Sequence, residues 1–378
     1  MAEMPPPHIS IIGAGISGLV LSRCLRQRGI SGIIYEKDTT RSGLARHGYG
    51  ITLQPSAYTP LLQYLAIDEW TFRRKVAVDA AVGGVGKVDG SAYEDTAFRA
   101  NRQRLEHLLR EGLDIKWEHQ LTGIEDNGSS HTLEFRNGDT AEAAIVVDAE
   151  GPHSFIRKHI SPTTDFNILP YAVYNGKRRL NPEGFNASYA SHLTDANIVE
   201  QRHGQTLLSI SISDRTEDLV NISYTYSRPA RSGDPIFDPD RPTSGAKDIP
   251  AALFQEITTL EGLQGPFKDV FDEEKMRQDR MLNWLMRSHS VNIDNLRDAA
   301  GKGIVLIGDT VHATPIVGGY GANQAILDGM ELAEYIAEHQ AKDLAEFYNS
   351  GRERRWKEEV EESERRLTNM HGTAGAKL

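Results

Sequence analysis

The sequence predicts an α/β fold: a Rossmann-like domain with a parallel sheet and a β-meander, an inserted mixed-sheet domain and a C-terminal helix. The stretch HISIIGAGISGLVLSRCL at residues 8–25 runs from an apolar strand through clustered glycines into an amphipathic helix, and SGIIYEK follows as a second strand. This strand–helix–strand order over ~30 residues is the unit from which parallel sheets are built. The same strand pattern returns as GIVLIGD at residues 303–309. Both ends of the chain are therefore expected to share one sheet.

The middle of the chain predicts the meander and the insertion. Asn-Gly pairs at 127–128 and 137–138 separate three short strands, as in hairpins. From about residue 165, alternating strands such as TLLSISIS precede a Pro/Gly/Asp-rich loop at 228–247 and then helices. The predicted boundaries are 1–70, 97–160 and 285–340 for the discontinuous first domain, 71–96 and 161–284 for the inserted substrate domain, 341–372 for the C-terminal helix and 373–378 for a flexible tail.

Composition restricts the function classes. The chain has 378 residues and a net charge of -11, which argues against nucleic-acid binding. Cys24 is the one cysteine, so neither an intramolecular disulfide nor a dithiol redox motif can form. No metal site is predicted.

Targeting signals are weak. The start MAEMPPPHIS lacks the charged and apolar regions of a signal peptide, and no apolar run approaches the ~18 residues that span a bilayer. A soluble, cytoplasmic protein without a membrane span is expected. The last residues, Ala376-Lys377-Leu378, resemble the peroxisomal address Ser-Lys-Leu, so import into peroxisomes is the alternative.

The first glycine turn predicts dinucleotide binding. In GAGISG, Gly13 permits a tight turn, Gly15 lets a pyrophosphate approach the backbone, and Gly18 lets the helix pack on the strand. The helix N-terminus offers N–H donors and partial positive charge to the phosphates. Glu36 ends the next strand, at the distance where a carboxylate can bind the ribose hydroxyls. This motif alone does not choose between NAD and FAD.

A second glycine turn, GDTVHATPIVGGYGANQAILDG at residues 308–329, has a different composition. Asp309 follows a strand, where its carboxylate can accept hydrogen bonds from a polyol chain. Three glycines, Gly318, Gly319 and Gly321, can bring backbone N–H groups close to a flat ligand. The helix that begins near Ala322 directs its positive end at that ligand, which suits the anionic edge of a reduced flavin.

At this motif the sequence resembles the single-component FAD-dependent monooxygenases of the para-hydroxybenzoate hydroxylase type. Their second motif runs Gly-Asp, two small residues, His, then Pro, Gly-Gly-x-Gly, Ala-Asn and Asp. The corresponding residues here are Gly308, Asp309, His312, Pro315, Gly318, Gly319, Gly321, Ala322, Asn323 and Asp328. The segment NRQRLEHLL places Arg102 where the family has an arginine that contacts FAD. The segment VVDAEGPHSFIR resembles the family's middle Asp-Gly motif, but has Glu150 in place of Asp.

The resemblance implies a mechanism and its cofactors. NAD(P)H, docking transiently, would reduce FAD; O2 would form a flavin C4a-hydroperoxide; and one oxygen atom would pass to a small aromatic or polycyclic substrate. The glycine loop and Pro315 would line the side where oxygen reacts, and His312 is interpreted as a structural residue that holds the loop. Two alternatives are a flavin-dependent reductase or oxidative cyclase on the same scaffold, and a flavoprotein without catalysis.

Substrate residues are harder to identify. In VYNGKRRL, Arg178 or Arg179 could hold a phenolate, although alternation allows only one to face a cavity, and Arg178 is the candidate. Tyr224 could line an aromatic pocket. His47, just after the second strand, is the third candidate catalytic residue.

Overall fold

A five-stranded parallel sheet forms the centre of the first part of the molecule. The structure is a computed structural model that describes residues 8–45, 48–89, 96–194, 196–318, 320–349 and 351–372. The strand order is β17-β9-β1-β2-β5, and every neighbouring pair is parallel. Its strands are β1 (Ile9–Ile12), β2 (Gly32–Glu36), β5 (Ile115–Trp117), β9 (Ile145–Asp148) and β17 (Ile304–Leu306). All residues of β1, β9 and β17 are buried, as expected for parallel strands covered on both faces.

Helices and a meander cover this sheet. The helices are α1 (Ile16–Gln27), α2 (Thr40–Ala45), α3 (Pro55–Leu65), α4 (Glu69–Val76), α5 (Arg102–Arg110), α6 (Phe155–Ile160), α11 (Ile293–Gly301) and α12 (Gly321–Glu338). The meander strands β6 (Leu121–Asp126), β7 (His131–Phe135) and β8 (Thr140–Ala143) pair antiparallel. Gly128 and Gly138 have positive φ between these strands, which confirms the two predicted Asn-Gly turns.

A second five-stranded sheet has the order β12-β13-β14-β11-β15. Its strands are β11 (Tyr171–Leu180), β12 (Ile198–His203), β13 (Thr206–Arg215), β14 (Val220–Pro229) and β15 (Arg280–Asn283). All four strand pairs are antiparallel, where the sequence predicted a mixed sheet. Short turns join β12 to β13 and β13 to β14, and such turns connect only antiparallel neighbours.

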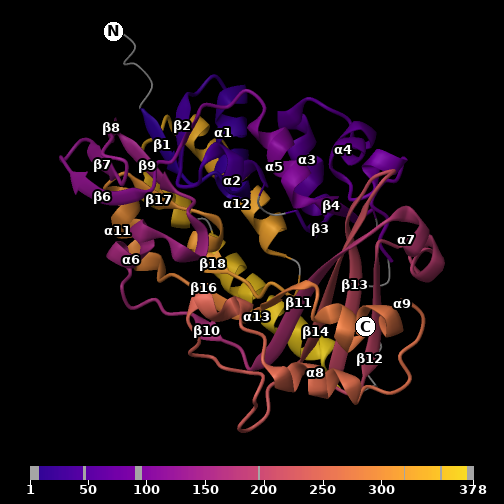
Figure 1. Cartoon of the computed structure of the whole chain (residues 1–378). Coiled ribbons are helices and arrows are strands. Elements are labelled where there is room, and N and C mark those ends of the chain that lie inside the picture. The colour runs from indigo at the N-terminus through magenta and orange to yellow at the C-terminus, as the bar shows by residue number, and fades with distance from the viewer. Residues whose placement is uncertain are drawn as a thin grey trace.

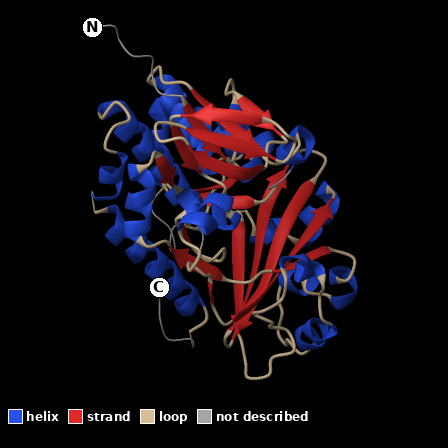
Figure 2. Ribbon diagram, turned by 90° about the vertical axis from the view of Figure 1, so that its left-hand side faces the viewer, coloured by secondary structure: helices blue, strands red, loops and turns tan. Residues whose placement is uncertain are grey.

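The second sheet is a separate layer with its own core. Helices α8 (Ala251–Thr258), α9 (Pro266–Val270) and α10 (Glu273–Met276) pack on its outer face, and α7 (Pro182–Ser188) follows β11. Figure 1 shows the parallel sheet at upper left and the long strands β11–β14 at lower right, with α8 and α9 in front of them. Figure 2 shows the same long strands in red, apart from the strands at the top of the molecule. Phe72 and Val76, expected in the inserted domain, pack in the first core instead.

Smaller elements connect the two sheets. They are the pair β3 (Gly50–Leu53) and β4 (Phe98–Asn101), and the three short strands β10 (Asn167–Ile168), β16 (Arg287–Ser290) and β18 (His312–Ala313). The C-terminal helix expected over 341–372 is divided: a 3-10 turn at Leu344–Asn349 precedes α13 (Arg352–Met370), and Gly351 between them has φ +81°. Within the described ranges, no helix has the length and apolar character needed to cross a membrane. Ala376–Leu378 lie outside the described residues.

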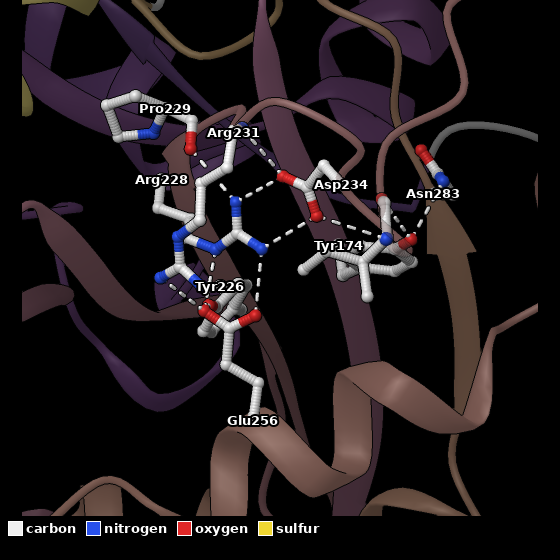
Figure 3. Close-up of polar contacts among 9 residues, drawn as sticks. Tyr174, Tyr226, Arg228, Pro229, Arg231, Asp234, Glu256 and Asn283 are labelled. Atoms are coloured by element: carbon white, nitrogen blue, oxygen red, sulfur yellow. Dashed lines mark hydrogen bonds and ion pairs between the residues drawn. The ribbon is translucent and has the colours of Figure 1, made fainter.

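A charged network secures the outer face of the second sheet (Figure 3). Arg228 on β14 is 2% exposed and binds Asp234 Oδ2 through Nη1 at 2.5 Å and Glu256 Oε1 through Nε at 2.6 Å. Tyr226 donates to the same Glu256 oxygen at 2.7 Å. The network therefore fixes the loop that carries Asp234 and the helix α8 to one strand.

Removing one partner of this buried network is expected to destabilise the protein strongly. Asp234→Ala removes one of the two carboxylates that bind the Arg228 guanidinium, so the free energy of unfolding should fall by about 3 kcal/mol. Urea unfolding followed by circular dichroism measures it. The control Asp240→Ala removes an exposed carboxylate of the same loop and should change stability by less than about 0.5 kcal/mol. Equal effects of the two substitutions would contradict the role of the network.

The same network should contribute to acid stability. Burial alone would raise the pKa of Asp234, but hydrogen bonds from Arg228 and two backbone N–H groups lower that pKa to about 2. Because the folded pKa lies below the ordinary value of about 4, the contribution is complete above pH ~4 and is lost as the pH falls towards 2. The stability difference between wild type and Asp234→Ala should therefore shrink across that window.

Candidate active site

The carboxyl ends of the parallel strands bring together most of the predicted site residues. The first glycine turn follows β1, Glu36 ends β2, and Asp309 follows β17 in a 3-10 turn. The central strand β1 lies between β2 on one side and β9 on the other. In open α/β sheets, ligands bind at the carboxyl edge where the strand order reverses in this way. The two distant glycine motifs thus meet at one edge of one sheet.

The first turn has the tight geometry expected for it. Gly13 has φ +108°, and a Cβ there would lie 2.5 Å from the carbonyl oxygen of Ala149. A Cβ on Gly18 would lie 2.2 Å from the carbonyl oxygen of Gly13. Gly15 precedes α1, and no side chain caps that helix. The N–H groups of its first turn therefore suit an anionic ligand such as a pyrophosphate.

Glu36 lies directly beside this turn. Its side chain is buried, Oε2 accepts a hydrogen bond from the Ala14 N–H at 2.7 Å, and Oε1 accepts one from the Asp38 N–H at 3.0 Å. The two bonds fix the orientation of the carboxylate at the end of β2, the position that the ribose of a dinucleotide requires.

The second turn is held by a buried carboxylate, Asp328 of α12. Asp328 accepts hydrogen bonds from the Gly308 N–H at 2.9 Å and the Trp356 Nε1–H at 3.1 Å, and its Oδ2 lies 2.7 Å from His312 Nε2. The His312 ring stacks on Trp356 with centroids 5.0 Å apart. Burial alone would lower the pKa of His312, but Asp328 raises it. His312 thus holds the loop, in agreement with its structural interpretation.

Asp309 and Arg102 lie at the same edge of the sheet and interact electrostatically. The Asp309 side chain is exposed although protein surrounds it, a combination typical of a recess. Burial raises the pKa of Asp309, and the positive charge of Arg102 opposes that rise. Arg102 is the first residue of α5; it donates to Glu106 Oε1 at 2.9 Å and to the hydroxyl of Tyr49.

The start of α12 completes the second turn. Gly318 has φ +139°, and a Cβ on Gly321 would lie 3.5 Å from Asp309 Oδ1, so the loop passes close to that carboxylate. The helix has no side-chain N-cap, and Ala322 lies in its first turn. Asn323 has another role: Oδ1 accepts from the Gln54 N–H at 2.8 Å, and Nδ2 donates to the Thr52 carbonyl at 3.0 Å.

The remaining predicted residues are Pro315, Gly319 and His47. Pro315 is buried just before the glycines. Gly319 and His47 lie outside the described residues.

The middle motif contains Glu150 and a second acid, the buried Asp148, which the sequence analysis did not single out. Glu150 Oε2 accepts the Phe155 N–H at 2.9 Å, while the buried Asp148 accepts the Ser154 hydroxyl at 2.5 Å. Burial, with Glu150 adding to it, raises the pKa of Asp148 to about 8. Gly151 N–H donates to Thr310 Oγ1 at 2.8 Å, which links this motif to the second turn. The missed signal was a second acid, two residues before Glu150.

Arg178 and Tyr224 do not reach this site. Arg178 Nη2 donates to Asp279 Oδ2 at 2.7 Å, and Tyr224 donates to the same oxygen at 2.7 Å. A Cβ on Gly176 would lie 2.0 Å from the Tyr224 ring, so glycine allows that ring to lie across β11. Both side chains belong to the outer face of the second sheet, because Tyr224 packs in the core beneath α9. The expectation that they contact substrate is therefore corrected: their partners are buried structural carboxylates and helices.

Lys177, which the sequence analysis did not single out, lies on the opposite face of β11 and points towards Gly48. Its ammonium donates to the Gly48 carbonyl at 3.2 Å and lies 5.7 Å from the centre of the Tyr49 ring. Burial lowers the pKa of Lys177. Alternation places Lys177 on the face of β11 opposite to Arg178, but it does not say which face meets the first sheet.

Comparison with known proteins agrees with this geometry. Residues 283–363 match the family model of an FAD binding domain, and residues 11–50 match that of an NAD(P)-binding Rossmann-like domain. The chain is 31% identical to the FAD-dependent monooxygenase nscC of Neosartorya fischeri over 97% of this chain and 96% of the relative. It is 32% identical to the FAD-dependent monooxygenase adaC of Aspergillus niger, over 97% of this chain and 94% of the relative.

Solved structures share the fold. A putative FAD-containing monooxygenase from Photorhabdus luminescens has a TM-score of 0.72 at 21% identity, covering 97% of this chain and 98% of that one. CtdE, solved in complex with FAD and a substrate, has a TM-score of 0.71 at 17% identity, covering 97% and 90%. The residues at the edge fit FAD: two uncapped helix N-termini, a first glycine turn without room for a Cβ, and the carboxylates of Glu36 and Asp309.

Substituting the third glycine of the first turn should abolish flavin retention. In Gly18→Ala the added Cβ would overlap the Gly13 carbonyl, so α1 must move away from β1 and its N-terminus with it. We expect the ratio of flavin to protein after purification to fall at least about tenfold. Gly301→Ala is the matched control, since a Cβ there meets nothing within 4 Å. Normal flavin content in Gly18→Ala would contradict the assignment of this turn.

Proposed function

Because the chain belongs to the family of FAD-dependent monooxygenases, we propose that it uses NAD(P)H and O2 to insert one oxygen atom into a small aromatic or polycyclic substrate. The observation that carries this proposal is the meeting of the two glycine turns at one edge of the parallel sheet. One turn suits the pyrophosphate of FAD and the other its ribityl and ring end. Relatives of nearly the same length support the same reaction class.

The proposed roles at the cofactor follow from the positions of the side chains. The N-terminus of α1 would bind the pyrophosphate and Glu36 the adenosine ribose. Asp309 would accept hydrogen bonds from the ribityl chain, and the N-terminus of α12 would stabilise negative charge on the flavin ring. Bound FAD supplies the redox chemistry that no side chain can perform: it accepts a hydride from NAD(P)H and activates O2.

The second sheet would supply the opposite wall of the reaction chamber. Its inner face approaches the first domain through several contacts: Lys177 donates to the Gly48 carbonyl, Asn101 Nδ2 donates to the Ser213 carbonyl at 2.8 Å, and Arg104 pairs with Asp214 at 2.6 Å. These contacts would hold the wall in place.

The deciding experiment follows oxygen into a product. The purified protein should show a two-banded yellow spectrum and release about one FAD per chain on heating. With a panel of polycyclic phenols and NADH or NADPH, a substrate should stimulate O2 uptake and yield a product heavier by one oxygen atom. Oxidation of NAD(P)H or of substrate without oxygen in the product would favour a reductase or cyclase. A purified protein that does not bind FAD would contradict the proposal.

Loss of the Asp309 carboxylate should weaken FAD binding without unfolding the protein. Hydrogen bonds to a charged group contribute about 1.5–3 kcal/mol, so Asp309→Ala should raise the Kd for FAD about 10- to 100-fold. Titration of apoprotein with FAD, followed by quenching of flavin fluorescence, measures this. Asp294→Ala, which removes an exposed carboxylate from α11, serves as the control. An unchanged Kd in Asp309→Ala would show that this residue is wrongly placed.

A further inference from the structure

One face of α13 packs against the second glycine turn. Ser363 of this helix is 1% exposed, and a Cβ added to Gly318 would lie 3.0 Å from Ser363 Oγ. Three residues further on, the guanidinium of Arg366 lies over the ring of Tyr320, 4.2 Å from its centre. Glu359 precedes Ser363 by four residues, which places both side chains on the same face of the helix. A carboxyl group of α13 therefore lies on the face that supports the glycine loop.

Glu359 is also joined to the first turn of α12. Its carboxyl group lies beside the amide of Gln324, which acts to lower the pKa of Glu359. Gln324 is 7% exposed and belongs to the N-terminal turn of the helix. The same turn approaches the ligand-binding edge, because a Cβ on Gly321 would lie 3.5 Å from Asp309 Oδ1. One helical turn thus contacts both Glu359 and the carboxylate assigned to the ribityl chain.

The surroundings of Glu359 stabilise its negative charge poorly. In the part of the chain that the structure describes, no group donates a hydrogen bond to Oε2, and Arg355 Nε lies 3.6 Å from Oε1, too far for one. Burial raises the pKa of Glu359 to about 7. Asp328 of α12 adds to this rise, whereas His312 of β18 and Arg355 of α13 oppose it. The side chain is 18% exposed, so protons from solvent can reach it.

Reduction of a bound flavin adds negative charge at the same end of α12. The positive N-terminus of the helix favours both anions, the reduced flavin and the ionised Glu359. The two anions repel each other, and a nearby like charge raises the pKa of a carboxyl group. Charges on two sides of one helical turn are separated by roughly the ~10 Å width of a helix, and buried charges at this distance are little screened. The charge of the flavin and that of Glu359 are thus expected to be coupled.

We propose that Glu359 takes up a proton from solvent when the bound FAD is reduced. A hydride from NAD(P)H gives the flavin two electrons and one proton. A second proton then forms an O–H bond on the Glu359 carboxylate, which removes one of the two negative charges. The reduction potential of the flavin therefore depends on pH through this residue. The inference goes beyond oxygen insertion, because it requires only that FAD binds at this edge.

The test measures the reduction potential of the holoenzyme by spectroelectrochemical titration across neutral and alkaline pH. The readout is the difference in potential between wild type and Glu359→Gln, in which the protonation of the flavin itself cancels. Below pH 7 Glu359 is protonated in both redox states, so the difference should be constant. Above pH 7 the potential of wild type should fall more steeply over about one pH unit, and then remain below that of Glu359→Gln.

Two further variants separate the charge from the packing. Glu359→Asp keeps a carboxylate and should again show the steeper section. Glu361→Gln removes an exposed carboxylate from the same helix and should behave as wild type. Flavin content and circular dichroism report folding in each case. In holoenzyme with carbon-13-labelled glutamate, one side-chain resonance should titrate at a pH of about 7 and be missing from Glu359→Gln.

The outcomes distinguish this inference from the proposed function. Equal slopes in wild type and Glu359→Gln at every pH would overturn it, as would a Glu359 resonance that does not titrate near neutral pH. If the steeper section depends on Glu359 but no substrate yields an oxygenated product, the inference stands and the monooxygenase proposal fails. If oxygen enters a product but the slopes are equal, the proposed function stands and the inference fails.

Discussion

The buried carboxylate of Asp328 fixes the geometry on which the second half of the site depends. It is fully buried, and an uncompensated charge there would cost several kcal/mol. Donors from two segments compensate it: the Gly308 N–H and the His312 ring belong to the second glycine turn, and the Trp356 indole belongs to α13. Through these bonds the turn that carries Asp309, the helix α12 that follows the glycine loop and the C-terminal helix hold one arrangement.

A second constraint is the junction of the two sheets. Arg99 lies between β3 and β13, and Lys177 reaches from β11 to the Gly48 carbonyl. Both contacts tie the second sheet to the segment that runs from Gly48 to β3.

How well the sequence predicted the structure depended on whether a constraint was local. Gly13 and Gly18 were predictable because backbone contacts within one turn exclude a Cβ, and the Asn-Gly hairpins were predictable for the same reason. The sequence could not decide between Arg178 and Lys177, because alternation separates the two faces of a strand without showing which face meets the other sheet. The sequence did not reveal that Asp148 binds Ser154. Asp148 is buried by β1 and β17, which are distant from it in the chain. Gly351 interrupts the last helix, although the charge pattern reads as continuous.

The period of two along β11 to β14 has an evolutionary consequence. Positions on the outer face, such as Tyr174 and Arg178, alternate with positions on the inner face, such as Asn175 and Lys177. A substitution on the inner face therefore leaves the outer core and its ion pairs untouched. Such a scaffold permits divergence among relatives that keep one cofactor and one architecture.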